Sequence, residues 1–389
     1  MPSLLAALTQ MIFACGPREF RTGVNKVFTR DNSSSDNENS DRTPPHDSGA
    51  DAFRSPPLSG QQSPNSNAMP ETRPSENASR TELMKGIELV RSELQRVIRG
   101  KADVIDQVLT AVLAEGSVLL EDVPGVGKTT LAKSLASLFD LQFQRVQCTP
   151  DLLPADILGS SIFQPATGEF QFRPGPIFCD LLIADEINRA SPRTQSALLE
   201  AMAEAQVTID GTRYPLTLPF IVIATQNPTG FEGTFPLPES QLDRFLFRMS
   251  MKYPDVESEI ALLIDQASAE PSDSLKPVMS RNDLVLLQQQ VRDISFDRKV
   301  AEYLVSLVGA TRRDSRLRVG CSPRGSKMLL RAAQARAVLQ KRDYVLPDDI
   351  QAVAVDVLSH RVASRNLSAT SEESAQIVRE LVNQMEVPV

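Results

Sequence analysis

A glycine-rich stretch, Asp-Val-Pro-Gly-Val-Gly-Lys-Thr-Thr at residues 122–130, constrains this chain more than any other feature. It follows a short apolar run at residues 117–120 and precedes the helix-forming residues 131–136, which predicts a strand-to-helix turn. Gly125 and Gly127 let the backbone curl so that successive N–H groups point inward, and the helix N-terminus adds a positive dipole. These are the properties of a phosphate-binding loop. Its predicted nucleotide-binding residues are Pro124, Gly125, Val126, Gly127, Lys128, Thr129 and Thr130.

Two side chains at the end of this loop carry the chemistry that a nucleoside triphosphate requires. Lys128 is placed to reach the β- and γ-phosphates, and the hydroxyl of Thr129 is placed to bind Mg²⁺. The strict pattern G-x-x-x-x-G-K-[ST] has glycine at its first position, where this chain has Asp122. On the pattern alone Asp122 is a departure, so the interpretation needs support from elsewhere in the chain.

That support comes from Leu-Leu-Ile-Ala-Asp-Glu at residues 181–186. Four apolar residues followed by two acids fit a buried parallel strand that ends at the edge of a site. Asp185 can hold Mg²⁺, and Glu186 can orient the attacking water for displacement at the γ-phosphate. The alternative is a glycine turn and an unrelated acidic strand end, since short motifs recur by chance. The order and spacing of the two motifs favour a nucleoside triphosphate hydrolase.

Composition excludes several other classes of protein. The 389 residues, of which 41% are hydrophobic, provide for about two domains with sizeable cores. A net charge of −8 argues against a surface that coats nucleic acid, although a local basic channel would not show in a sum. Neither zinc ligation nor a disulfide framework is expected, because the cysteines are far apart and only two histidines accompany them. These residues are Cys15, Cys148, Cys179, Cys321, His46 and His360.

The N-terminal residues carry weak targeting signals. Residues 3–15 resemble a short apolar signal core that ends in Ile-Phe-Ala-Cys15, which keeps secretion or lipidation as an alternative, but no basic segment precedes it. Residues 31–80 are dominated by Ser, Asn, Asp, Pro and Gln, so residues 1–80 are predicted to be a disordered tail. A natural start further downstream, for example at Met69, would remove most of it. No apolar run reaches the length of a membrane span, and a cytoplasmic location is expected.

The rest of the chain divides into two predicted domains, residues 81–253 and 254–389. In the first, two helices lead into the loop strand, and four further strands suit a parallel sheet covered by helices on both faces. Two hairpins are also expected, one at 164–173 and one at 207–216 that turns at Asp210-Gly211. After Tyr253 the pattern is wholly helical. The predicted helices are 83–98 and 102–115, and the predicted strands are 117–120, 142–147, 181–184, 220–224 and 245–249.

Three more polar residues are candidates for the site. Asn227 follows a buried strand where a side chain can reach the γ-phosphate or the attacking water, although an asparagine before proline is also common in turns. Arg244 lies between apolar neighbours near a sheet edge and can act on a phosphate across a subunit interface. Arg324 lies at the start of a helix in the second domain and can contact the nucleotide. Taken singly, each arginine fits a surface or salt-bridge role better than a role in the site.

The order of these elements resembles that in the AAA+ ATPases, and the amino-acid sequence of the motifs is most similar to the MoxR family. The resemblance runs from about Gly100 to Arg336. Its densest segments are residues 119–129, 149–154, 168–170, 173–176, 184–195, 224–228 and 236–245.

The resemblance implies a P-loop αβα core with a five-stranded parallel sheet, a smaller all-helical lid, a hexameric ring, and ATP hydrolysis at subunit interfaces. The family's loop commonly carries an acid or glycine at the position of Asp122. Asn227 matches the residue called sensor 1, Arg244 the trans-acting arginine finger and Arg324 sensor 2, with Arg248 as a second candidate for the finger. The hairpins match insertions that face the ring pore or a neighbouring subunit, although they can also merely extend the sheet.

The same resemblance implies an ATP-driven, chaperone-like remodelling or maturation role, with Mg²⁺ as cofactor and proteins with von Willebrand factor A-type domains as partners. One departure is Gly100-Lys101, where the family usually shows Gly-Gln near the adenine. Two alternatives remain at this point: a nucleotide-dependent assembly scaffold with little turnover, and a chelatase- or helicase-like motor. Intact Glu186 and Arg244 argue against the scaffold, and the acidic composition argues against a motor that acts on nucleic acid.

Overall fold

Polar residues that are far apart in the sequence reach one edge of a parallel sheet in this fold.

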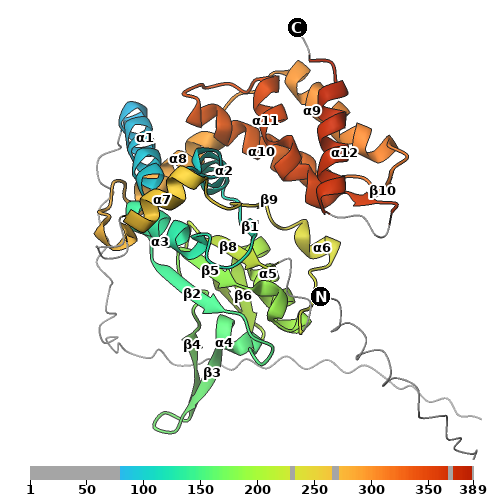
Figure 1. The fold of residues 1–389 in the computed structure, drawn as a ribbon. Coiled ribbons are helices and arrows are strands. Elements are labelled where there is room, and N and C mark those ends of the chain that lie inside the picture. The colour runs from blue at the N-terminus through green and yellow to red at the C-terminus, as the bar shows by residue number, and fades with distance from the viewer. Residues whose placement is uncertain (1–78, 228–232, 265–270, 367–370, 388–389) are drawn as a thin grey trace, which may run out of the picture. The chain divides into compact units, whose positions relative to one another are not determined.

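The computed structural model describes residues 79–227, 233–264, 271–366 and 371–387, all within one compact unit (Figure 1). Of the predicted disordered segment 1–80, only Ser79 and Arg80 fall among these residues. Ser79 caps the first helix, because its hydroxyl accepts from the Glu82 N–H while the Glu82 carboxylate accepts from the Ser79 N–H.

The central sheet has five parallel strands, as predicted. They are β1 (Val118–Glu121), β2 (Phe143–Gln147), β5 (Leu181–Asp185), β8 (Ile221–Gln226) and β9 (Phe247–Met249), in the order β2-β5-β8-β1-β9. The three middle strands are nearly continuous apolar runs because both faces of the sheet are covered. Their carboxyl ends therefore lie side by side.

Two apolar layers enclose this sheet. Alternate side chains of β5, Leu181 and Ile183, pack with the helices α1 (Arg80–Val97), α2 (Ala102–Leu113) and α3 (Lys128–Leu138). Their neighbours Leu182 and Ala184 pack on the opposite face with α4 (Pro154–Leu158) and α5 (Pro192–Glu204). The period of two along the strand thus divides the core between the two faces.

Two hairpins project from the core. The first pairs β3 (Gly159–Gln164) with β4 (Glu169–Pro174), and the second pairs β6 (Gln206–Ile209) with β7 (Thr212–Pro215). The second turns at Asp210-Gly211, both with positive φ, as predicted. The predicted range 164–173 for the first hairpin was wrong at its start. That range begins at the last residue of β3, whose exposed and mixed residues give no strand signal.

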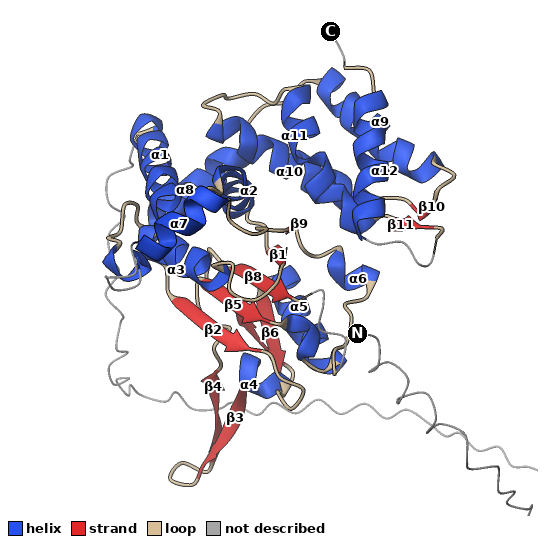
Figure 2. Cartoon of the chain, viewed as in Figure 1, coloured by secondary structure: helices blue, strands red, loops and turns tan. Residues whose placement is uncertain are grey.

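The C-terminal part of the described chain is mainly helical (Figure 2). After α6 (Glu239–Leu242), its helices are α7 (Val256–Ile264), α8 (Arg281–Arg292), α9 (Arg298–Arg313), α10 (Pro323–Leu339), α11 (Pro347–Leu358) and α12 (Ser371–Gln384). The expectation of a wholly helical pattern after Tyr253 needs one correction. The strands β10 (Leu317–Val319) and β11 (Ala363–Ser364) form a small antiparallel pair, which is too short to leave a periodic signal.

Three single 3-10 turns complete the described elements: η1 (Ile187–Arg189), η2 (Pro271–Ser274) and η3 (Ser359–Arg361). Within the described ranges, none of the helices combines the length and apolar character that crossing a membrane requires.

Candidate functional site

The phosphate loop lies on the predicted strand-to-helix turn. β1 ends at Glu121, and α3 begins at Lys128 with Gly127 as its N-cap. Gly125 and Gly127 have φ of 87° and 92°, a conformation that other residues adopt only with strain. A Cβ built on either glycine would meet nothing within 4 Å, so the loop opens onto free space. The backbone of residues 124–130 can therefore surround a phosphate group there.

Lys128 is held close to three carboxylates. Its Nζ donates a hydrogen bond of 2.7 Å to the backbone carbonyl oxygen of Asp122. Burial lowers the pKa of Lys128, while the negative charges of Asp122, Asp185 and Glu186 oppose that shift. The lysine, the loop and both acids of the second motif thus belong to one electrostatic cluster. A polyanionic phosphate chain can exchange with the carbonyl as the partner of this ammonium group.

The Asp122 side chain fastens the base of the loop to the chain that follows β9. Its carboxylate accepts hydrogen bonds from the Ser250 hydroxyl at 2.7 Å, from the Lys252 N–H at 3.1 Å and from the Met251 N–H. It is 6% exposed. The departure from glycine at this position therefore has a structural role, because the carboxylate satisfies two backbone donors beside the loop.

We expect Asp122→Ala to lower the free energy of unfolding by about 2–4 kcal/mol, because it leaves two backbone donors and a hydroxyl without their acceptor. Ser250→Ala is the matched control, since it removes one donor and leaves the two backbone bonds, and about 1 kcal/mol or less is expected. Urea denaturation of the two variants measures both losses. Equal losses in the two variants would contradict this role for Asp122.

Asp185 lies at the buried end of β5. One carboxylate oxygen accepts from the Arg145 Nε at 2.7 Å, and the other accepts from the Thr225 hydroxyl at 3.2 Å. The Arg145 side chain is half exposed, so it can move away when a cation takes its place. Sequence reasoning missed both Arg145 and Thr225. Arg145 gave no usable signal, while Thr225 lies in residues 224–228, where the sequence pattern points only to Asn227.

Glu186 follows directly and turns out of the strand. Its φ of 55° is in the left-handed region, and its backbone N–H donates to the Thr225 hydroxyl at 2.9 Å. The carboxylate accepts from Arg189 at 2.8 Å and from Gln147 at 3.3 Å. The strained backbone directs this side chain away from Asp185's position in the sheet. The Thr225 hydroxyl therefore holds both acids, because it donates to the Asp185 carboxylate and accepts from the Glu186 backbone N–H.

Asn227 lies at the same edge of the sheet. It follows β8, whose last residue, Gln226, is in register with Glu121 at the end of β1. Its carbonyl oxygen accepts from the Asn188 side chain at 3.5 Å. Asn227 thus directly follows β8 and is next to the strand that leads into the phosphate loop. The residues that follow, 228–232, lie outside the described ranges.

The two candidate finger arginines differ in their surroundings. Arg244, just after α6, donates to the Leu199 carbonyl at 2.7 Å and is half-buried. Arg248, on β9, forms an ion pair of 2.8 Å with Glu121 inside its own chain. Arg324 is exposed near the N-terminus of α10. Within the described part of the chain, no hydrogen bond or ion pair joins Arg244 or Arg324 to the loop or to the two acids.

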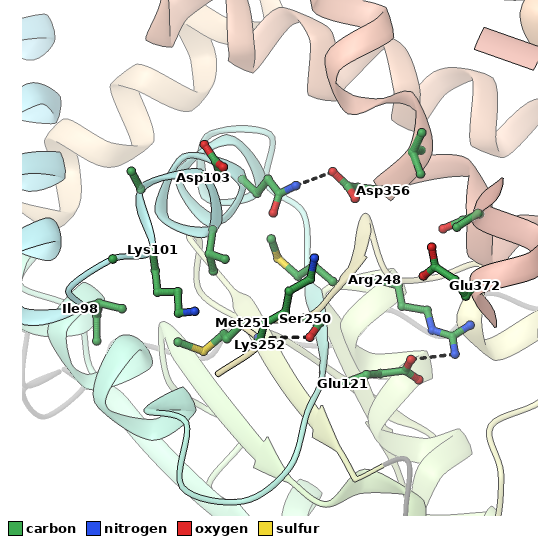
Figure 3. Close-up of a pocket in the computed structure, with 18 of the residues that line it drawn as sticks. Ile98, Lys101, Asp103, Glu121, Arg248, Ser250, Met251, Lys252, Asp356 and Glu372 are labelled. Carbon is green, nitrogen blue, oxygen red and sulfur yellow. Dashed lines mark hydrogen bonds and ion pairs between the residues drawn. The ribbon is translucent and has the colours of Figure 1, made fainter. Parts of the chain in front are cut away.

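A cavity of about 1050 Å³ lies beside the base of the loop (Figure 3). Its walls come from the segment before α2, from the exit of β9 and from the lid helices α11 and α12. Lys101, the departure from the family's Gly-Gln, donates to the Tyr253 carbonyl at 2.5 Å. Burial raises the pKa of Asp356 to about 6, and its carboxylate accepts from Gln107. The cavity is large enough for a nucleoside.

Comparison with known proteins agrees with this geometry. The family model for "ATPase family associated with various cellular activities (AAA)" matches residues 117–247, and the model for the AAA lid domain matches residues 309–381. A proposed ATPase from Cytophaga hutchinsonii, whose crystal structure is known, has a TM-score of 0.73 and 37% identity, with 80% of this chain and 97% of that chain covered. The fold and the site therefore define an AAA+ ATPase.

Proteins with similar sequences identify the family to which the chain belongs. Chaperone MoxR1 of Mycobacterium tuberculosis is 39% identical over 295 residues, which are 74% of this chain and 78% of the relative. Protein MoxR of Methylorubrum extorquens is 31% identical over 69% of this chain and 85% of its own length. The uncharacterized protein YeaC of Bacillus subtilis is 49% identical over 76% of this chain and 93% of its own length. The chain belongs to the MoxR family of AAA+ ATPases, as its sequence motifs predicted.

Proposed function

We propose that this protein hydrolyses ATP and uses the energy to remodel or mature partner proteins. One observation carries the first part. The strands β1, β5 and β8 bring Lys128, Asp185 and Glu186 to one edge of the sheet, where the two acids act electrostatically on the lysine. A cation for the phosphates and two carboxylates next to it are the groups that phosphoryl transfer to water requires.

The donor set also fits Mg²⁺. A threonine hydroxyl and a carboxylate are the hard oxygen ligands that this ion takes alongside substrate phosphates and water. Thr129 and Asp185 would hold it, with the ion taking the place of Arg145, the cationic partner of Asp185 in this structure. When bound, Mg²⁺ would supply charge neutralisation for the phosphates.

The remaining groups have separate roles in hydrolysis. The backbone of residues 124–130 and Lys128 hold the phosphates in place. Glu186 orients and polarises the attacking water, and Asn227 contributes a polar group at the γ-phosphate position. The nucleoside occupies the cavity beside the loop, where Lys101 and Arg248 lie. Arg324 of the lid approaches the nucleotide when the lid closes.

The site is completed by a second subunit in this proposal. Arg244 has no contact with its own chain's phosphate loop, and an arginine that acts across an interface must be placed in this way. We therefore propose a ring, of six subunits by resemblance to the family, in which Arg244 of one subunit reaches the nucleotide of the next. The ion pair of Arg248 with Glu121 favours Arg244 as the finger.

The other parts of the proposal rest on the sequence and the family. We propose a core at 81–253, a lid at 254–389 and an N-terminal tail at 1–80, in a cytoplasmic protein. The name of the mycobacterial relative, Chaperone MoxR1, supports a chaperone-like role. Proteins with von Willebrand factor A-type domains are the proposed partners, and nucleic acid is not an expected ligand.

Steady-state phosphate release with Mg²⁺-ATP tests the proposed activity, with Lys128→Ala as the diagnostic variant. The variant removes the ammonium group that holds the phosphates, so a loss of at least about 100-fold in kcat/KM is expected. Lys133→Ala, further along the same helix, is the control and should change this value by less than threefold. ATP binding without turnover by the unsubstituted protein would favour the assembly scaffold instead.

The motor alternative has its own test. The electrostatic contribution to nucleic-acid binding is largest at low salt, so filter binding of single- and double-stranded DNA and RNA at about 50 mM salt is the most sensitive condition. We expect no retention there. Retention that strengthens as salt falls would favour a nucleic-acid motor.

A further inference from the structure

A buried arginine of the lid, Arg361, holds the segment that carries the proposed finger. Its side chain is 1% exposed and lies in η3, which packs against α6. The guanidinium forms an ion pair of 3.0 Å with the Asp243 carboxylate. Asp243 is the residue directly before Arg244, so this contact fixes the backbone from which the finger extends.

The same guanidinium also binds the backbone around the finger. It donates to the carbonyl oxygens of Asp243 and Leu246, at 3.2 Å each, and to that of Phe245. The neighbouring His360 contacts the Phe245 carbonyl through Nε2 at 3.0 Å. Three carbonyls and one carboxylate in residues 243–246 are therefore held by one side chain, a number of contacts that only the planar fork of arginine provides.

Burial lowers the pKa of Arg361 to about 10, and the Asp243 charge opposes that shift. The group is therefore a cation at neutral pH. A buried cation of this kind is stable only while its partners stay in place, which makes the geometry of residues 243–246 well defined.

Arg361 also contacts the part of the lid that carries Arg324. A Cβ built on Gly325, the residue after Arg324, would lie 3.0 Å from the Arg361 Cδ and 2.2 Å from the Cys321 Sγ. The N-terminus of α10 thus packs directly on the Arg361 side chain. A shift of α10 would be transmitted to Arg361 and from there to residues 243–246.

We infer that Arg361 is a positioning residue that links Arg324, which responds to the nucleotide of its own subunit, to Arg244, which acts on the nucleotide of the next. This inference rests on the proposed function, because it requires Arg244 to act in trans. Arg361 of the lid thereby positions Arg244 and couples the nucleotide sites of neighbouring subunits.

Two single variants of the full chain test this role first. Arg361→Lys keeps the charge and loses the fork, and Asp243→Asn keeps the shape of the partner and loses its charge. Each should reduce turnover by about 10- to 100-fold, as misplacing a reacting group by about 1 Å can do, while the Kd for ATP changes less than threefold. Asp243→Asn replaces Arg361→Lys as the test if the latter does not fold. An unchanged turnover in a folded variant would overturn the inference.

The decisive step mixes either variant with an excess of Glu186→Gln subunits, which are inactive themselves but carry an intact finger and lid. Turnover per variant subunit should recover to within about threefold of the unsubstituted protein, because each variant site then receives Arg244 from a sound neighbour. A defect confined to the variant's own site would not recover, and that result would overturn the inference.

Two controls separate this test from the proposed function. Arg244→Ala mixed with Glu186→Gln should recover in the same way; if it does not, the finger in trans is wrong and the inference fails with it. If Arg244→Ala recovers and Arg361→Lys does not, only the inference fails. Arg318→Gln breaks the exposed ion pair of 2.8 Å between the lid and Glu239 of α6, and it should change turnover by less than about twofold.

Discussion

Glu186→Gln is expected to lower the rate of ATP hydrolysis by about 10²–10⁴-fold while leaving ATP binding nearly unchanged. The amide keeps the size of the side chain but cannot accept or polarise a proton of the attacking water. The backbone N–H of residue 186 keeps its bond to the Thr225 hydroxyl, so the turn and the position of Asp185 are preserved. The effect should therefore fall on kcat.

Single-turnover phosphate release and nucleotide binding by fluorescence measure these two quantities separately. Glu200→Gln, an exposed carboxylate on α5, is the matched control and should retain full activity. A Glu186→Gln variant that keeps more than a third of the normal rate would show that another group activates the water.

Arg244→Ala is expected to lower turnover by about 10³-fold or more, which is the usual contribution of an arginine finger. Its loss removes the 2.7 Å bond to the Leu199 carbonyl, a carbonyl that lies inside α5 and keeps its place in that helix, so the free energy of unfolding should fall by about 1 kcal/mol or less. The substitution thus separates catalysis from stability.

Arg248→Ala should behave in the opposite way. It leaves Glu121, which is 14% exposed, without its cation, and we expect a loss of about 1–3 kcal/mol in stability with weaker ATP binding. Saturating ATP should restore most of its turnover. If Arg248→Ala instead abolishes turnover at saturating ATP while Arg244→Ala is active, the two roles must be exchanged.

Much of the core could be predicted because its signals are local. The three middle strands are apolar runs that end in polar residues, and the loop glycines mark the turn between strand and helix. Parallel strands then bring Lys128 and the two acids to one edge without further information. Asp210-Gly211 likewise specified its hairpin, since both residues tolerate positive φ.

Other features depend on contacts between distant residues and left no such signal. Arg145 meets Asp185 only because β2 and β5 are neighbours in the sheet. The family resemblance accommodates an acid at Asp122 but gives no physical reason for it, and its bonds to residues 250–252 supply that reason. Arg361, which lies far from the finger in sequence, gave no pattern at all. Its role follows from the packing of the lid on residues 243–246.

The two short strands of the lid and the first strand of the exposed hairpin were missed for a related reason. β10 and β11 contain three and two residues, and β3, Gly-Ser-Ser-Ile-Phe-Gln, is largely exposed and shows no alternation of polar and apolar residues. Neither case buries a face that would impose a period of two on the sequence. Pairing with a partner strand, rather than local preference, determines these elements.

Phosphate release per subunit, measured across protein concentration with Mg²⁺-ATP, tests most directly the claim that the site is completed by a neighbouring subunit. Turnover per subunit should rise with concentration to a plateau as the assembly forms, and it should disappear in Glu186→Gln at every concentration. Turnover that is independent of concentration down to the monomer, with Arg244→Ala fully active, would contradict the account.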